Sequence, residues 1–247
     1  MTTLLVINGN TTQAITDRVA ATARAIASPG TTIKAVTAKT GPRVISTRAE
    51  NLLGAHNVLS LAARHHAGCA AVVVAVASDT GLRAVREALP IPVTGITEAA
   101  LLTACALGDG FGYLAIGRRG AGMYREVIAG YGLTTRMAAF KAIDLPPDAF
   151  LTPSDAAEPI LAAVSELAEA GADTVIIGGA AFAGLGRQFQ DRSPIPIVDG
   201  VSSAVRLAET LAALALPKPR SGGYAALPPR ELIDVDPAIA ALFKPRE

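Results

Sequence analysis

The chain has 247 residues, of which 51% are hydrophobic and 17% charged, and its formal net charge is +1. This length suits either one large domain or two lobes of ordinary size, and the composition predicts a well-buried core. Basic and acidic residues form no block, which argues against nucleic acid or an anionic membrane surface as a partner.

The apolar runs of the chain are only as long as strands, and no basic region precedes a long apolar stretch at the N-terminus. A membrane-spanning helix or a signal peptide would need such a stretch. We therefore expect a soluble cytoplasmic protein that does not enter a membrane.

Strand and helix patterns alternate along the first part of the chain. Continuous apolar runs, typical of buried parallel strands, predict strands over 3–7, 31–38, 71–77 and 92–95. Between and after them, helices are expected over 13–27, 48–67, 82–89 and 97–107, the first of them capped by a threonine.

The same order restarts at Phe111. Strands are predicted over 112–116, 137–143, 174–177 and 195–198, and a helix over 154–170. The tail beyond Pro217 is rich in Pro and Gly and is expected to wrap the surface.

Two segments repeat one another at an offset of 103 residues. AGCAAVVVAVASDTGL begins at Ala67 and AGADTVIIGGAAFAGL at Ala170, and PIPVTG from Pro90 returns as PIPIVDG from Pro194 with one inserted residue. The repeat predicts a duplicated α/β fold, with two parallel sheets in Rossmann-like lobes related by a pseudo-twofold axis. We place the lobes at residues 1–110 and 111–247, the C-terminal segment being free to pack back on the first lobe.

Ligands of parallel α/β sheets bind beyond the carboxyl ends of the strands, where loop amides and helix N-termini converge. Duplication brings two such edges together, and the predicted site draws on four loops, at 8–12, 77–81, 117–120 and 179–183. Their short hydroxyl and amide side chains could bind a small carboxylate or ureide, or could simply cap the following helices. The convergence of four loops favours a binding site.

The two cysteines, Cys69 and Cys105, are interpreted as core residues. Cys69 precedes a strand that is expected to be buried, and Cys105 lies in a helix rich in Ala and Leu. Neither has the spacing of a metal ligand, and no spacing of His, Asp and Glu suggests a metal site.

Six short motifs occur along the chain. They are INGNTT, GPRVIS, SDTGL, PVTGITEAA, YGL and PIVDGVSSAVRLAE, which begin at Ile7, Gly41, Ser78, Pro92, Tyr131 and Pro196. Together they resemble the aspartate/glutamate/hydantoin racemase superfamily, and most closely its hydantoin and allantoin racemase branch. The resemblance spans nearly the whole chain. It implies two Rossmann-like lobes, no cofactor, a small carboxylate or a cyclic ureide or imide as substrate, and a homo-oligomer.

The resemblance also implies a pair of catalytic cysteines, one in each lobe, of which one removes the α-proton and the other returns it. Thiols suit this chemistry because a nearby helix N-terminus can lower their pKa towards neutrality. The matching positions of this chain hold Val76 and Gly179. Neither side chain can exchange a proton, so two-base racemisation by these positions is excluded.

Two other residues are candidates for catalysis. Asp79 could act as a general acid or base if its carboxyl group is partly desolvated, or could cap the helix that starts near Leu82. Arg118 matches a tyrosine in the anion site of the arylmalonate decarboxylase relatives. It could bind a carboxylate in a bidentate manner or stabilise a developing enolate, or could be a solvated loop residue. The predicted substrate-binding residues come from the same four loops: Asn8, Asn10, Thr11, Val76, Ser78, Thr80, Arg119, Gly179 and Ala180.

Weaker candidates carry polar groups with a simpler structural explanation. Three histidines lie on or at the end of the second predicted helix, and Tyr124 follows Arg119 on a helix where packing is the commoner role. Glu98 and Asp199 follow the fourth strand of each half and are expected to stabilise local turns. The histidines are His56, His65 and His66.

Three functions remain open. The first is a cofactor-independent enzyme of carbon-acid chemistry, an isomerase or decarboxylase in which Asp79, Arg118 or water moves the proton. The second is a hydrolase of a small cyclic amide, imide or ureide, in which Asp79 activates water. The third is a binding protein that has lost the reaction. Family resemblance favours the first, and the absence of both thiols favours the other two.

Overall fold

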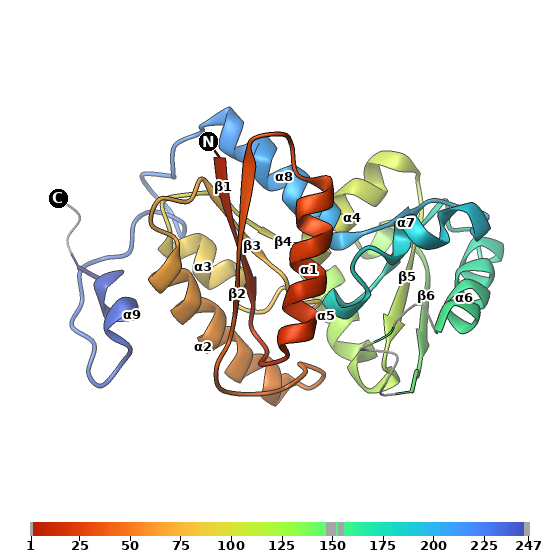
Figure 1. Cartoon of the computed structure of the whole chain (residues 1–247), viewed down its shortest axis with the longest axis horizontal. Coiled ribbons are helices and arrows are strands. Elements are labelled where there is room, and N and C mark those ends of the chain that lie inside the picture. The colour runs from red at the N-terminus through yellow and green to blue at the C-terminus, as the bar shows by residue number, and fades with distance from the viewer. Residues whose placement is uncertain (1, 147–151, 153–155, 245–247) are drawn as a thin grey trace.

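The computed structural model describes residues 2–146, 152 and 156–244, and it has two lobes, each built on a four-stranded parallel sheet (Figure 1). In the first sheet the order is β2-β1-β3-β4, with β1 at Thr2–Asn8, β2 at Thr31–Thr37, β3 at Ala71–Val74 and β4 at Val93–Gly95. In the second the order is β6-β5-β7-β8, with β5 at Phe111–Ile116, β6 at Met137–Ile143, β7 at Thr174–Ile177 and β8 at Ile197–Val198. The predicted α/β fold with two equivalent parallel sheets is confirmed.

The duplication is visible in the register of the elements. β3 and β7 begin 103 residues apart, and so do the helices that follow them, α3 at Leu82–Ala88 and α7 at Leu185–Phe189. The predicted strand over 71–77 was too long by three residues. β3 ends at Val74 because its neighbour β4 ends at Gly95, directly opposite. Residues 75–77 therefore extend beyond the sheet, where they can reach a ligand.

The other α-helices cover the faces of the two sheets, except for α9, which lies on the outside of α2 (Figure 1). They are α1 at Gln13–Ile26, α2 at Arg48–His65, α4 at Ile96–Leu107, α5 at Ala121–Gly130, α6 at Ala157–Glu169, α8 at Gly200–Leu214 and α9 at Pro237–Ala241. The start predicted at residue 154 for α6 lies outside the described residues. Among the residues that are described, no helix is long and apolar enough to cross a membrane.

One expected cap is wrong. Thr12 precedes α1, but its side chain makes no capping hydrogen bond. Its hydroxyl instead donates to the carbonyl of Arg43 at 2.7 Å. The threonine therefore holds the loop before α2 next to the start of α1.

The helix that follows the fourth strand of each sheet packs across the boundary between the lobes. α4 contacts β5, β7 and β8 of the second sheet, and α8 contacts β1, β3 and β4 of the first. The two helices also pack on each other, and the hydroxyl of Thr94 on β4 donates to the carbonyl of Ala204 on α8 at 3.1 Å. The boundary predicted at residue 110 falls between α4 and β5. One buried apolar cluster, which includes Leu4, Leu114 and Val205, consequently runs through both lobes.

The C-terminal segment returns to the first lobe, where α9 packs on α2 (Figure 1). Asp236, which caps α9, accepts hydrogen bonds from Ser60 and Arg64 of α2. The tail beyond Pro217 thus lies along the surface of the first lobe.

Candidate functional site

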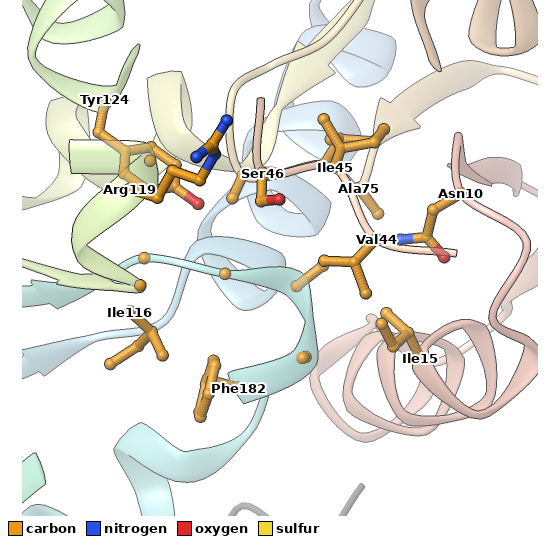
Figure 2. A pocket seen from close by; sticks show the side chains of 18 residues that line it. Asn10, Ile15, Val44, Ile45, Ser46, Ala75, Ile116, Arg119, Tyr124 and Phe182 are labelled. Carbon is orange, nitrogen blue, oxygen red and sulfur yellow. The ribbon is translucent and has the colours of Figure 1, made fainter. Parts of the chain in front are cut away.

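A cavity of about 120 Å³ lies between the lobes, beyond the carboxyl ends of both sheets (Figure 2). All four loops selected from the sequence contribute to its wall, through Asn10 after β1, Val76 after β3, Arg119 after β5 and Ala180 after β7. The segment 44–46 before α2 completes the lining. Such a position, at the strand ends of two facing sheets, is where α/β proteins bind small molecules.

Val76 and Gly179 both line this cavity, one from each lobe. Gly179 has a φ of +126°, and a Cβ atom built on it would lie 3.0 Å from the ring of Phe182. The second lobe therefore presents bare backbone at this point, whereas the first presents an isopropyl group. Neither group can take up or release a proton.

Most of the cavity wall is apolar. It includes large side chains from both lobes, namely Ile15, Val44, Ile45, Ile116 and Phe182 (Figure 2). Apolar surface of this kind binds the hydrocarbon part of a ligand. Among the described residues none contributes a carboxylate to the wall, so they offer no partner to a ligand with a cationic side chain.

Two polar side chains, Arg119 and Tyr124, lie together at one end of the cavity, with Asn10 at the other end of the view (Figure 2). Arg119 is exposed and forms no ion pair with any described residue. The side chain of Tyr124 is buried, and burial raises the pKa of its hydroxyl to about 12. The guanidinium is thus available to an anion, and the phenol stays protonated at neutral pH.

Arg118, predicted as catalytic, lies outside the cavity lining. Its side chain is 72% exposed, with Nε 3.4 Å from a carboxylate oxygen of Asp144, and its backbone N–H donates to the same carboxylate. The turn over residues 118–120 directs successive side chains to different sides, so Arg119 rather than Arg118 reaches the cavity. This exposed position agrees with the alternative interpretation, a solvated loop residue, and a catalytic role for Arg118 stays a prediction.

Asp79, the other predicted catalytic residue, also lies outside the cavity lining. It is buried, and its carboxylate accepts hydrogen bonds from the backbone N–H groups of Thr97 (3.0 Å) and Glu98 (2.7 Å) and from the hydroxyl of Tyr131 (2.7 Å). Burial raises the pKa of Asp79 to about 7, against the opposing effect of these hydrogen bonds. Asp79 therefore stabilises the N-terminus of α4, whereas the sequence suggested a cap on the helix at Leu82.

Ser78 and Thr80 face away from the cavity. Their two hydroxyls and the side-chain carbonyl of Asn51 on α2 form one cluster, in which the carbonyl accepts from at least one hydroxyl. Ser78 and Asp79 line a separate cleft between α2, α3 and α5. The β3–α3 loop thus reaches the cavity with residues 75–77 only.

Of the three candidates at the end of β1 and in the loop after it, only Asn10 lines the cavity. Asn8 is buried and donates to the side-chain oxygen of Asn10 at 3.0 Å, which fixes the orientation of that amide. Thr11 donates through its backbone N–H to the carbonyl of Pro42 at 3.0 Å. Asn8 and Thr11 therefore hold the site in place and do not border it.

Sequence reasoning missed the segment 44–46. The motif GPRVIS covers it, but no role was assigned to these residues. Ser46 is held by Glu50, whose carboxylate accepts bonds from the backbone N–H and the hydroxyl of Ser46. A capping box between Thr47 and Glu50 fixes the start of α2 and with it the position of this segment.

The remaining candidates have structural partners. Asp199 caps α8 through the N–H of Ser202 and accepts a second bond from the N–H of Gly184, and Glu98 pairs with Arg86. No histidine lines the cavity, and no group of three His, Cys, Asp or Glu among the described residues could hold a metal ion.

The comparisons with known proteins agree with this architecture. The family model for Asp/Glu/Hydantoin racemase matches residues 4–208. A hydantoin racemase of Paenarthrobacter aurescens is 32% identical over 225 residues, which cover 90% of this chain and 95% of that protein. The allantoin racemase structure from Klebsiella pneumoniae superposes with a TM-score of 0.88 at 31% identity and covers 97% of this chain and 99% of that one. The allantoin racemase of Pseudomonas fluorescens gives the same TM-score at 33% identity, over 94% of this chain and 99% of that one.

Proposed function

Because the chain belongs to the Asp/Glu/hydantoin racemase family, we propose that it is a cofactor-independent enzyme of carbon-acid chemistry. Its substrate is a small carboxylate or a cyclic ureide or imide, bound in the cavity between the lobes. The observation that carries the proposal is the unpaired guanidinium of Arg119 at one end of a mostly apolar cavity.

The cavity wall has a cationic region and an apolar region, and each suits a different part of the substrate. Arg119 pairs with a carboxylate or with a polarised carbonyl, and its planar fork can make two parallel hydrogen bonds. The apolar residues of both lobes, with Ile116 and Phe182 among them, pack against the hydrocarbon substituent of the same molecule. A substrate with one anionic end and one apolar end therefore fits better than a dicarboxylate amino acid.

The reaction differs from two-base racemisation. That reaction needs one proton-transfer group on each side of the α-carbon, and the positions of both lobes that face the cavity hold Val76 and Gly179. A reaction that forms an enolate by loss of a leaving group needs only one proton transfer afterwards. Decarboxylation is such a reaction, and we favour it over racemisation for this reason.

The hydrolase alternative needs a base that activates water. Asp79 was the candidate, and both of its carboxylate oxygens are engaged by the start of α4 and by Tyr131, outside the cavity lining. No observation on the cavity therefore favours hydrolysis.

The test is turnover of hydantoins, cyclic imides and malonates in deuterated water, followed by NMR. Deuterium at carbon, with or without loss of CO₂, supports the proposal. Ring opening without deuterium at carbon would assign a hydrolase instead. Saturable binding without turnover would identify a binding protein, and the proposal of an enzyme would then be wrong.

A further inference from the structure

Tyr124 on α5 brings an unpartnered hydroxyl to the cavity. The residue is 6% exposed, lines the cavity, and its hydroxyl makes no hydrogen bond to any described residue. The hydroxyl oxygen is not among the fully buried unpartnered atoms of the described residues, so it stays accessible at the cavity wall. Because a hydroxyl can both donate and accept, and no protein group occupies this one, it is free to bond to a ligand in the cavity.

The ring of Tyr124 is held firmly. Its centroid lies 5.7 Å from that of Tyr113, and the two planes are inclined by 39°. On another side it approaches Gly120 so closely that a Cβ atom there would lie 3.4 Å from the ring. Packing of this kind fixes the side-chain rotamer, so the hydroxyl is aimed at the cavity before a ligand binds.

We propose that Tyr124 is the proton donor of this site and delivers a proton to one face of a carbanion whose carboxylate is held by Arg119. This inference rests on the proposed function and names the catalytic group for it. Both side chains line the cavity, and Figure 2 shows them on the same side of it.

The step is balanced for a disubstituted malonate. The bond between the α-carbon and one carboxylate breaks, CO₂ leaves, and the electron pair stays on the α-carbon as an enediolate conjugated with the second carboxylate. The enediolate takes the proton of the Tyr124 hydroxyl and forms the new C–H bond. Water at the mouth of the cavity returns a proton to the phenolate, and the net reaction consumes one proton and releases CO₂.

Electrostatics support this order of events. Burial raises the pKa of Tyr124 to about 12, so the group is protonated at neutral pH and serves as an acid rather than a base. The charge of Arg119 stabilises the enediolate and then the transient phenolate. The opposite positions, Val76 and Gly179, hold no second donor, so protonation occurs from one side only.

The experiment compares Tyr124→Phe with Tyr113→Phe in the full chain, with 2-methyl-2-phenylmalonate as probe in deuterated water. Tyr113 is a matched control because it is fully buried, its hydroxyl also lacks a partner, and it does not line the cavity. We expect the wild type and Tyr113→Phe to give one enantiomer with one deuterium at carbon. General acid catalysis contributes about 10²–10⁴-fold, so Tyr124→Phe should lose about 100-fold or more in turnover.

Binding is measured separately by isothermal titration calorimetry, and the surroundings of the tyrosines are followed by their absorbance, since the chain has no Trp and four Tyr. The probe should perturb the spectrum of the wild type and of Tyr113→Phe, and should still bind Tyr124→Phe with little of that perturbation. If Tyr124→Phe keeps the rate and the single enantiomer, the inference is wrong and the proposed function stands. If the wild type binds the probe without releasing CO₂, the donor role is overturned. If no hydantoin, imide or malonate binds the wild type, the proposed function itself fails.

Discussion

In both halves of the molecule, a carboxylate connects the loop after the third strand to the helix that packs across the lobe boundary. In one half this carboxylate belongs to the loop, and in the other it belongs to the start of the helix. In the first half, Asp79 in the β3–α3 loop accepts from the N–H groups of Thr97 and Glu98 at the start of α4. In the second half, Asp199 at the start of α8 accepts from the N–H of Gly184 in the β7–α7 loop, at 2.7 Å. Both halves thus keep the connection between loop and helix, but the loop accepts the hydrogen bonds in the first half and donates one in the second.

This difference explains why position in the repeat does not define a role. The residue 103 positions after Asp79 is Phe182, which packs on the cavity wall. The carboxylate of Asp79, by contrast, is buried behind the loop and bonds to backbone and Tyr131. Equivalent positions therefore stabilise the fold in one half and line the cavity in the other.

The first prediction compares how much the hydrogen bonds of Asp79 and those of Asp199 contribute to the stability of the fold. Asp79→Ala leaves two backbone N–H groups and one tyrosine hydroxyl without their partner in a buried site, and each such group costs about 1–3 kcal/mol. We expect a loss of at least about 3 kcal/mol in the free energy of unfolding, measured by denaturant titration. Asp199→Ala removes a half-buried helix cap and should cost only about 1 kcal/mol. Equal losses would show that the two connections are equivalent after all.

The second prediction concerns how the contribution of Asp79 to stability depends on pH. The pKa of Asp79 is raised from 3.8 to about 7 in the folded protein, so the folded state binds a proton that the unfolded chain has already released between these values. The contribution of Asp79 to stability therefore falls as pH rises from about 4 to about 7, by at most about 1.4 kcal/mol per pH unit, and is constant above that range.

Other carboxylates change with the opposite sign. Glu50, Glu209 and Asp236 have lowered pKa values because of their hydrogen bonds, so their contributions are lost at acid pH. The measurement is accordingly the difference in unfolding free energy between the wild type and Asp79→Asn across pH 4 to 8. A difference that does not change with pH would show that Asp79 is ionised throughout.

Much of the fold could be predicted from the chain because it depends on local patterns. Buried parallel strands read as continuous apolar runs, and such runs located β3 and β7, which begin 103 residues apart as the repeat does. The direction of single side chains could not be predicted in this way. Arg118 and Arg119 are neighbours of the same type, and only the geometry of the turn decides which one lines the cavity.

The role of Asp79 was hidden for a related reason. Its partners, the start of α4 and Tyr131, are 18 to 52 residues away in sequence. A local pattern can suggest a cap on the next helix but cannot show that the loop turns towards a later one. The segment 44–46 was missed because Val44 and Ile45 carry no chemical signature in a sequence, and a single serine, Ser46, carries little.

The third prediction concerns Val76 and Gly179, the two cavity positions at which the halves differ most. Gly179→Cys places a side chain at a φ of +126° and its Cβ 3.0 Å from Phe182, so we expect a loss of about 1–3 kcal/mol in stability. Val76→Cys replaces one small buried side chain by another and should cost less. Thermal unfolding of the two single variants makes the comparison, and an equal cost would contradict the strain argument.

The same pair tests whether the site can regain the chemistry of two bases. If the double variant folds and carries two reactive thiols, slow exchange of the α-proton of a hydantoin should appear by NMR in deuterated water. Absence of exchange from every hydantoin and amino acid tested would mean that the cavity has changed beyond the two positions.

The fourth prediction separates two neighbouring arginines of the second half. Arg119→Ala should reduce catalytic efficiency or anion affinity about tenfold, which corresponds to about 1.4 kcal/mol, because the cavity loses its guanidinium. Arg119→Lys should recover only part of it, since lysine lacks the planar fork. Arg118→Ala is the matched control and should behave as the wild type, because Arg118 pairs with Asp144 in solvent. The reverse order of effects would move the anion site to Arg118.

The smallest effect is expected from the cysteines, neither of which lines the cavity. Cys69 precedes β3 in the core of the first lobe, where burial raises the pKa of its thiol, and Cys105 is a partly exposed residue of α4. Iodoacetamide should therefore label Cys105 faster than Cys69, as measured by mass spectrometry, and should leave turnover nearly unchanged. Replacing both residues by alanine should lower stability rather than turnover, since it removes a buried sulfur contact with the carbonyl of His65. Loss of turnover in a double variant that keeps the wild-type circular dichroism spectrum would place a thiol in the mechanism, and the division of roles between Val76, Gly179 and Tyr124 would have to be abandoned.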